Sequence, residues 1–219
     1  MNHFVKNNLN LYCMDCMDLM AKYPDNHFDL AIVDPPYGGD DAIGIKNNKI
    51  GKKQATKRTD YKVFENVEPT KEYFKELIRV SKHQIIWGVN FYNNFNLSGG
   101  RICWDKKGTA FGRAELAYYS GSKSVNICEI VWNGMIQQNI KNKEVRIHPT
   151  QKPVALYKWL LQNYAKEGDK ILDTHLGSGS IAIACHDMNF NLTGCEIDED
   201  YFVHMCERIN IHTSQLQLF

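Results

Sequence analysis

Apolar residues along the chain form two kinds of pattern: short continuous runs, and stretches with an apolar residue every three or four positions. Continuous runs of this length are typical of buried strands, and the second spacing is typical of one face of a helix. We expect strands at 10–14, 28–33, 84–89, 101–105, 114–120, 126–132, 170–173 and 191–197. We expect helices from the first strand to Met20 and at 70–82, 153–165, 180–188 and 198–210. Strands that alternate with helices predict an α/β fold with a Rossmann-like, doubly wound, mostly parallel sheet.

Composition limits the class of protein. The chain has 219 residues, of which 43% are apolar, and contains no repeat or linker, so we expect a single domain over 1–219. The first residues lack the apolar run of a signal peptide, and no stretch reaches the roughly 18 apolar residues of a membrane span. Seven scattered cysteines argue against a disulfide framework, so a cytoplasmic protein without a membrane partner is expected. Cys13 and Cys16 supply only two of the four ligands of a zinc site, and we expect no metal.

A glycine-rich turn follows the strand at 170–173. Gly177 and Gly179 allow the backbone to approach a ligand closely, and the helix that follows favours negative charge at its N-terminus. Glu196 ends the next strand, 19 residues beyond Gly177, where an acid accepts hydrogen bonds from a ribose diol. The pattern indicates an adenosine-containing cofactor, either NAD or S-adenosylmethionine; the alternative is a tight turn between a strand and a helix.

A second turn, Asp34-Pro35-Pro36-Tyr37, follows the apolar strand at 28–33. Neither proline donates an N–H, and both have a fixed φ, so their carbonyls and the Asp34 carboxylate form a small cage of acceptors. The matching guest is the exocyclic amine of adenine or cytosine, with Tyr37 stacked on the ring of the base. A base must leave the duplex to reach such a cage, at a cost of a few kcal/mol. The alternative is a plain Asp-Pro-Pro turn.

Three motifs in one order resemble the amino-group DNA methyltransferases: Asp34-Pro-Pro-Tyr-Gly38, His148-Pro-Thr-Gln-Lys-Pro153 and Asp173-x-x-x-Gly-Ser-Gly179. The catalytic tetrapeptide precedes the cofactor glycines, which resembles the circularly permuted β class in its small bacterial or phage form. The segment "CMDCMDLM" is similar to the one that reaches the cofactor adenine in this family, and "GCEID" is similar to its acidic strand end. Three ordered motifs are more specific than any one of them.

The resemblance implies a fold, a methyl donor and a set of site residues. The fold is that of S-adenosylmethionine-dependent methyltransferases, and the amine attacks the sulfonium methyl directly. The implied catalytic residues are Asp34, Pro35, Pro36 and Tyr37. The implied cofactor-binding residues are Asp15, Cys16, Asp34, His148, Thr150, Gln151, Lys152, Asp173, His175, Gly177, Ser178, Gly179, Glu196 and Ile197. Among these, Glu196 would take the ribose and Asp15 the adenine.

The chain departs from the family pattern in two places. Thr174-His175 stand where the family usually has Pro-Phe, which adds a titratable group beside the cofactor. The region 120–147, where this class recognises its target, is short. Adenine N6 is favoured over cytosine N4 because the tetrapeptide begins with Asp, and an NAD-binding oxidoreductase would leave the proline cage unexplained. Whether the enzyme belongs to a restriction-modification pair or acts alone stays open.

Two further segments predict partners. Double-stranded DNA is the expected substrate, and with a net charge of only +1 its contacts must come from local patches such as the basic loop 40–62. The loop residues expected to clamp phosphates are Lys52, Lys53, Lys57 and Arg58. In the tail 211–219, Gln215–Phe219 resembles the peptide by which bacterial proteins bind the replication sliding clamp; the alternative is that it docks on its own domain. A monomer or a homodimer is expected.

Overall fold

The computed structural model describes residues 2–38, 66–93, 95–107, 112–132 and 136–214. Its strands are β1 (His3–Lys6), β2 (Leu9–Cys13), β3 (Phe28–Val33), β4 (Ser81–Trp87), β5 (Gly100–Asp105), β6 (Ala114–Tyr119), β7 (Val125–Glu129), β8 (Lys170–Asp173) and β9 (Asn191–Glu196). Its helices are α1 (Cys16–Met20), α2 (Lys71–Val80), α3 (Val154–Tyr164), α4 (Ser180–Asp187) and α5 (Glu199–Ser214). Among the described residues, no helix is both long and apolar enough to span a membrane.

All nine strands form one sheet in the order β1-β2-β9-β8-β3-β4-β6-β5-β7. The central pairs β2–β9, β9–β8, β8–β3 and β3–β4 are parallel, as are β5 and β7, whereas β1–β2, β4–β6 and β5–β6 are antiparallel. The predicted α/β class with a mostly parallel sheet is therefore confirmed. The antiparallel pairs lie at one edge and around β6, where short connections replace helical crossovers.

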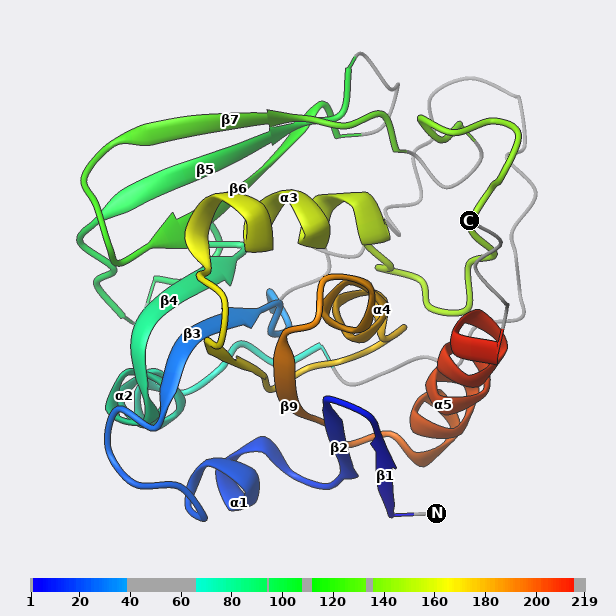
Figure 1. The fold of residues 1–219 in the computed structure, drawn as a ribbon. Coiled ribbons are helices and arrows are strands. Elements are labelled where there is room, and N and C mark those ends of the chain that lie inside the picture. The colour runs from blue at the N-terminus through cyan, green and yellow to red at the C-terminus, as the bar shows by residue number, and fades with distance from the viewer. Residues whose placement is uncertain (1, 39–65, 94, 108–111, 133–135, 215–219) are drawn as a thin grey trace.

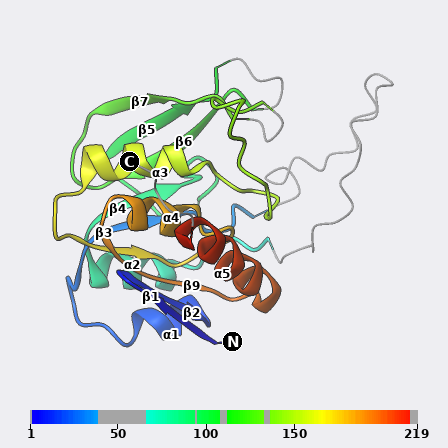
Figure 2. The ribbon, with the colours of Figure 1, turned by 45° about the vertical axis from the view of Figure 1, so that its right-hand side comes forward.

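The sheet lies between two layers of helices (Figure 1). One face packs on α3, α4 and α5 and includes Leu30 and Ile32 of β3. The opposite face packs on α1 and α2 and includes Ala31 and Val33 of the same strand. Because successive side chains of a strand point to opposite faces, one continuous apolar run serves both layers. Figure 2 shows the two layers from the side, with α5 beside α4.

The site is positioned where the chain direction across the sheet reverses. From β3 the chain passes through α2 to β4, and from β8 it passes through α4 to β9, so the two crossovers leave the neighbouring strands β3 and β8 in opposite directions. A crevice opens beyond the carboxyl ends of two such strands. Asp34 follows the last residue of β3, and Asp173 ends β8.

Several boundaries differ from the sequence-based expectation, three of them as follows. Helix α2 ends at Val80 rather than at 82, because Ser81 adopts an extended conformation (φ −130°, ψ 141°) and its Oγ donates to the Leu77 carbonyl at 2.5 Å. Helix α5 continues to Ser214 rather than ending near 210, and the Thr213 hydroxyl donates to the Ile209 carbonyl at 2.8 Å. The strand expected at 126–132 ends at Glu129.

Strand β1 was not predicted. It buries a single apolar side chain, Phe4, so its four residues carry too little pattern to be recognised from the sequence. It forms by antiparallel pairing with β2, whose other edge pairs with β9.

Candidate active site

A crevice of about 590 Å³ lies at the carboxyl ends of β3, β8 and β9. Four segments meet there: the turn after β3, the glycine turn after β8, the end of β9 and the segment between His148 and Lys152. Of the residues predicted for catalysis or cofactor binding, those that line it are Asp15, Cys16, Asp34, Pro35, Pro36, Tyr37, His148, Thr150, Gln151, Lys152, His175, Gly177, Ser178, Glu196 and Ile197. Segments far apart in the sequence thus form one site, as the order of the motifs predicted.

The acceptor cage at Asp34–Tyr37 is present, and side-chain donors already form hydrogen bonds with its acceptors. The Tyr37 hydroxyl donates to Asp34 Oδ1 at 2.6 Å, and Lys152 Nζ donates to Asp34 Oδ2 at 2.5 Å. The Tyr92 hydroxyl donates to the Pro35 carbonyl at 2.9 Å. The prediction that no backbone donor competes for this cage overlooked side-chain donors supplied by distant parts of the chain.

Lys152 is buried beside two carboxylates. Its Nζ lies 2.5 Å from Asp34 Oδ2 and 3.1 Å from Glu115 Oε2, and only 4% of its side chain is exposed. Burial alone would lower the pKa of Lys152, but the two carboxylates outweigh it, so the pKa is raised and the ammonium stays charged. Burial would raise the pKa of Glu115, but Lys152 and Lys106 lower it to about 2. Lys152, predicted to contact the cofactor, lines the crevice and pairs with Asp34 of the catalytic turn.

The Tyr37 ring is fixed by packing. It stacks on Phe91 with ring centroids 4.8 Å apart and planes 10° apart. Gly88, at φ +76°, leaves room for it, because a Cβ there would lie 2.2 Å from Tyr37 Cε1. Burial and the Asp34 carboxylate raise the pKa of the Tyr37 hydroxyl well above its usual value, so it remains a donor. One ring face is thus already used by Phe91.

The glycine turn is held by carboxylates that accept backbone N–H groups. Glu196 Oε2 accepts from Gly177 N at 2.8 Å, and Glu196 Oε1 accepts from Asp198 N at 3.0 Å. Burial raises the pKa of Glu196 above its usual value. Glu196 therefore joins the end of β9 to the turn after β8, and its carboxylate faces the crevice.

The two glycines of this turn face different surroundings, which corrects one predicted residue. Gly177, at φ +50°, faces the crevice, where an added Cβ would meet the His148 ring at 3.6 Å. Gly179, at φ +70°, does not line the crevice, and an added Cβ would lie 2.4 Å from Cγ of Met205 in α5. Gly179 was predicted to contact the cofactor, but it instead allows α4 and α5 to pack closely.

Asp173 also differs from its predicted role. Its side chain is buried outside the crevice, and Oδ1 accepts from His175 N at 2.9 Å. Burial raises its pKa to about 8, so the carboxyl is mostly protonated at neutral pH. Asp173 supports the turn from the core side. A carboxyl at the end of a buried strand can point into the core or toward a ligand, and that of Asp173 points into the core.

The departure from the family pattern at Thr174-His175 has a structural basis. Thr174 Oγ1 lies 2.7 Å from the Tyr73 hydroxyl and 2.9 Å from His175 Nδ1, and the His175 ring packs edge-on against Tyr73. Burial lowers the pKa of His175 to about 4, so the ring is neutral at pH 7. An uncharged aromatic ring therefore stands beside the crevice.

The segment from His148 to Lys152 closes the crevice. The His148 ring packs against Tyr201 at 4.3 Å, and burial, together with Arg146 and Lys152, lowers its pKa to about 4. The Gln151 side-chain oxygen accepts from Ile147 N at 3.0 Å, and the Gln151 backbone carbonyl accepts from Trp132 Nε1 at 3.0 Å. Gln151 lines the crevice and braces this segment.

At the opposite end of the crevice, Asp15 caps α1. Its Oδ1 accepts from Met17 N at 2.7 Å, as the sequence Asp-Cys-Met-Asp allows. Cys16 lies beside it, and burial followed by the Asp15 charge raises the thiol pKa to about 12. Cys16 is therefore a thiol and not a thiolate at neutral pH.

Several lining or supporting residues were missed. Glu115 lies at the second position of β6, where nothing in the local sequence separates it from an exposed strand residue, and Tyr92 lies in a loop. The other missed residues of the crevice are Met17, Asn66, Val67, Glu68, Pro69, Thr70, Tyr73, Tyr157, Leu176, Asp198 and Tyr201. The predicted DNA contacts Lys52, Lys53, Lys57 and Arg58 and the tail segment Gln215–Phe219 lie outside the described residues.

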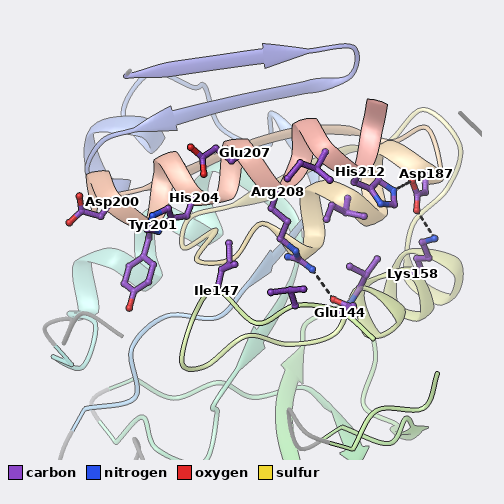
Figure 3. Close-up of a pocket in the computed structure, with 14 residues that line it drawn as sticks. Glu144, Ile147, Lys158, Asp187, Asp200, Tyr201, His204, Glu207, Arg208 and His212 are labelled. Carbon is purple, nitrogen blue, oxygen red and sulfur yellow. Dashed lines mark hydrogen bonds and ion pairs between the residues drawn. The ribbon is translucent and has the colours of Figure 1, made fainter. Parts of the chain in front are cut away.

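A second cavity, of about 830 Å³, lies between α5 and the segment at 144–147 (Figure 3). Arg208 crosses it and donates to Glu144 Oε2 at 2.7 Å, to the Ser178 carbonyl at 2.7 Å and to Ser180 Oγ at 3.0 Å. Glu144 also accepts from Val154 N at 2.9 Å. Arg208 therefore ties the glycine turn to the start of α3, behind the crevice.

Comparison with known proteins identifies the class. Residues 104–207 match the family model for N6/N4 DNA methylases, which is described as DNA methylase. The match contains Glu115, the segment from His148 to Pro153, the glycine turn and Glu196, whereas Asp34 lies before it. The resemblance to the amino-group DNA methyltransferases is confirmed: residues 104–207 match a DNA methylase model of the N6/N4 type.

Individual relatives agree with this class. Type II methyltransferase M2.DpnII of Streptococcus pneumoniae is 23% identical over 241 aligned positions, which cover 91% of this chain and 88% of the relative. The M1.HpyAVI–SAM complex has a similar fold, with a TM-score of 0.56 and 17% identity over 91% of this chain and 99% of that one. The cytosine-N4-specific PvuII DNA methyltransferase has a TM-score of 0.57 and 12% identity over 96% of this chain and 95% of that one. The predicted methyltransferase fold is confirmed.

Proposed function

We propose that the protein is an S-adenosylmethionine-dependent DNA methyltransferase that methylates the exocyclic N6 amine of a flipped adenine. The observation that carries this proposal is that the Asp34-to-Tyr37 cage and the Gly177 turn open on one crevice. A cage of acceptors suits an amine, and a glycine turn with an acid at the next strand end suits an adenosine. Either feature alone would fit a wider range of proteins.

The crevice fits the cofactor in size and chemistry. A volume of about 590 Å³ lies within the usual range for small-molecule sites. Carboxylates at Glu196 and Asp15 accept hydrogen bonds from hydroxyl and amino groups, and Gly177 keeps the space beside His148 clear of a side chain. Bound there, S-adenosylmethionine would supply a methyl group on a sulfonium. Glu196 would hold the ribose, and Asp15 the adenine.

The residues of the catalytic turn would hold and orient the amine. Asp34 and the Pro35 carbonyl accept its two hydrogens, which turns the nitrogen lone pair toward the methyl carbon. With the cofactor bound, the N–C bond would form as the S–C bond breaks, and the amine would release one proton to solvent. No covalent nucleophile is required, because alignment of the two reactants supplies most of the acceleration. This agrees with a Cys16 thiol whose pKa, near 12, keeps it protonated.

Cytosine N4 is the alternative target. The Asp at position 34 favours adenine, but the amines of the two bases are chemically alike, and the matching family model spans both types. The test is to incubate the protein with methyl-labelled S-adenosylmethionine and unmethylated DNA, then digest the DNA and identify the labelled nucleoside. We expect N6-methyladenine. Labelled N4-methylcytosine would replace the adenine assignment, and an absence of label in DNA would reject the proposed function.

The region 120–147 supports a role in target recognition. Its described part exposes apolar side chains unusually often: Val125, Ile127, Ile136, Ile140 and Val145 are each more than half exposed. Such side chains contact base edges and sugars once DNA is bound. The basic loop 40–62 would add phosphate contacts. Replacing Lys52, Lys53, Lys57 and Arg58 by Ala should weaken DNA binding and flatten its salt dependence, and an unchanged slope would remove the loop from the interface.

The C-terminal segment Gln215–Phe219 would bring the enzyme to newly replicated DNA by binding the sliding clamp of a bacterial host. Two leucines and a phenylalanine in a short peptide are suitable anchors for an apolar pocket on a partner. A labelled peptide of residues 212–219 should bind the clamp, and a peptide with Leu218→Ala and Phe219→Ala should not. Equal weak binding of the two peptides would reject this partner.

A further inference from the structure

The acceptors that would hold the target amine are engaged before any substrate arrives. Asp34 accepts from Tyr37 and Lys152, and the Pro35 carbonyl accepts from Tyr92. A carboxylate has about four lone-pair positions, so two donors leave room for an amine hydrogen. The number of hydrogen bonds therefore does not prevent binding of the base.

Charge is the obstacle. With Lys152 Nζ at 2.5 Å, the ammonium neutralises the Asp34 carboxylate. During transfer the amine nitrogen gains positive charge, which a free carboxylate stabilises and an ammonium at the same place opposes. The enzyme needs a way to move the Lys152 charge away from Asp34 without releasing it into an apolar site.

Glu115 provides the place to which this charge can move. Its Oε2 is buried and lies 3.1 Å from Lys152 Nζ, which is an ion-pair distance but without good hydrogen-bond geometry. Its Oε1 is already paired with Lys106. A small rotation of the lysine would shorten the contact to Oε2 and improve its geometry.

The surroundings of Lys152 suit such a movement. The Nζ atom lies 5.6 Å from the centre of the Tyr37 ring and 5.4 Å from the centre of the Trp87 ring. Both distances lie within reach of a cation–π attraction, so the ammonium keeps aromatic contacts on either side. The backbone of Glu115 stays in place, since it pairs with Trp104 of β5.

We infer that Glu115 is a positioning residue that draws the Lys152 ammonium away from Asp34 when the target amine enters, so that Asp34 meets the amine as a free carboxylate. This inference rests on the proposed methyl transfer. Lys152 remains paired throughout: it contacts both carboxylates before the base binds, with the shorter contact to Asp34, and it pairs with Glu115 alone afterwards. The role of Lys152 is to neutralise the charge of Asp34 while the crevice holds no base.

The test is single-turnover transfer to DNA by Glu115→Gln, which keeps the shape of the side chain and removes its charge. We expect the rate to fall roughly 10- to 100-fold, while the Kd values for S-adenosylmethionine and DNA change by less than about threefold. Glu115→Asp restores the charge and should be at least about fivefold faster than Glu115→Gln. A purely structural role would not separate these two variants in this direction.

Lys106→Met is the matched control, because it removes the other partner of Glu115 and leaves the acceptor for Lys152; its rate should stay within about threefold of the wild type. Thermal melting establishes that each variant is folded. A rate for Glu115→Gln within twofold of the wild type, or Glu115→Asp as slow as Glu115→Gln, overturns the inference. An absence of methyl transfer by the wild-type protein would instead overturn the proposed function, so the two failures are distinguishable.

Discussion

The two turns that face each other across the crevice are built in different ways. The turn after β8 is held mainly by bonds from backbone N–H groups to carboxyl groups, Gly177 to Glu196 and His175 to Asp173, with one side-chain bond from Arg208 to the Ser178 carbonyl. The turn after β3 is held by side chains from distant segments: Lys152 and Tyr92 donate hydrogen bonds to it, and Phe91 stacks on its tyrosine. Backbone bonds leave a turn little freedom, whereas side-chain donors can be exchanged.

The difference matches what each turn has to do. A cofactor turn presents the same surface in every cycle, so fixed backbone bonds suit it. A turn that receives a base must release one set of donors and accept another, so replaceable side-chain partners suit it. The buried charges follow the same division, since Lys152, Asp34 and Glu115 gather at the exchangeable turn, whereas Asp173, with a pKa of about 8, supports the fixed turn mainly as a neutral acid.

The largest expected effect comes from Asp34→Asn. The change keeps the shape of the side chain but removes the carboxylate that stabilises charge on the amine, so single-turnover transfer should fall more than about 10³-fold. The Kd for S-adenosylmethionine should change less than about threefold, because the glycine turn is intact. Isothermal titration and a single-turnover assay measure the two quantities. A rate within tenfold of the wild type would contradict the assignment of Asp34.

A pair of glycine substitutions separates binding from packing. Gly177→Val places a side chain in the crevice beside His148 and should weaken S-adenosylmethionine binding roughly 10- to 100-fold. Gly179→Val drives a side chain into Met205 and should lower the free energy of unfolding by about 2–3 kcal/mol. Calorimetry of binding and denaturant melts provide both readouts. Equal loss of affinity in two equally stable variants would mean that both glycines face the ligand.

Glu196→Gln, which alters the turn after β8, should have a smaller effect on cofactor binding. The single amide oxygen can accept from Gly177 N or from Asp198 N but not from both, and it lacks the charge that strengthens bonds to the ribose hydroxyls. We expect the Kd for S-adenosylmethionine to rise about tenfold, with the single-turnover rate at saturating cofactor nearly unchanged. A fall in that rate with unaltered affinity would place Glu196 in the chemical step.

The last expected effect is the pH dependence of stability produced by Asp173. Its pKa is about 8 in the fold and near 3.9 in the unfolded chain, so the unfolded state loses this proton first. The contribution of the protonated carboxyl to stability is therefore fully present below pH 4 and is lost as the pH rises to 8. Asp173→Asn cannot titrate, and its Tm relative to the wild type should increase by several degrees between pH 5 and 8. A constant difference in Tm would mean that Asp173 is ionised in the fold.

Much of the architecture followed from local patterns. The strands at 28–33 and 170–173 were predicted to the residue, because an aspartate marks the end of each short apolar run: Asp34 directly follows the first strand, and Asp173 is the last residue of the second. Thr70 was predicted to cap α2, and its hydroxyl accepts from Tyr73 N at 3.3 Å. Strand β1 was missed, because what stabilises it is its pairing with β2. The end of α5 was misplaced, because helical spacing was followed only as far as Asn210.

The sequence by itself determined that the strand ends at Asp34 and Asp173 would meet, because parallel strands bring their carboxyl ends to one edge of the sheet. It also indicated the class of chemistry through the ordered motifs at these turns, where prolines restrict the backbone and glycines free it. Only the tertiary structure decided that Lys152 would pair with Asp34 and Glu115, that Gly179 would face α5, and that Asp173 would be buried. These outcomes depend on which side of a turn each atom faces and on partners 37 to 118 positions away, as between Lys152 and Glu115 or Asp34. Contacts between such distant residues leave no periodicity in the sequence, so packing of the whole chain determines them.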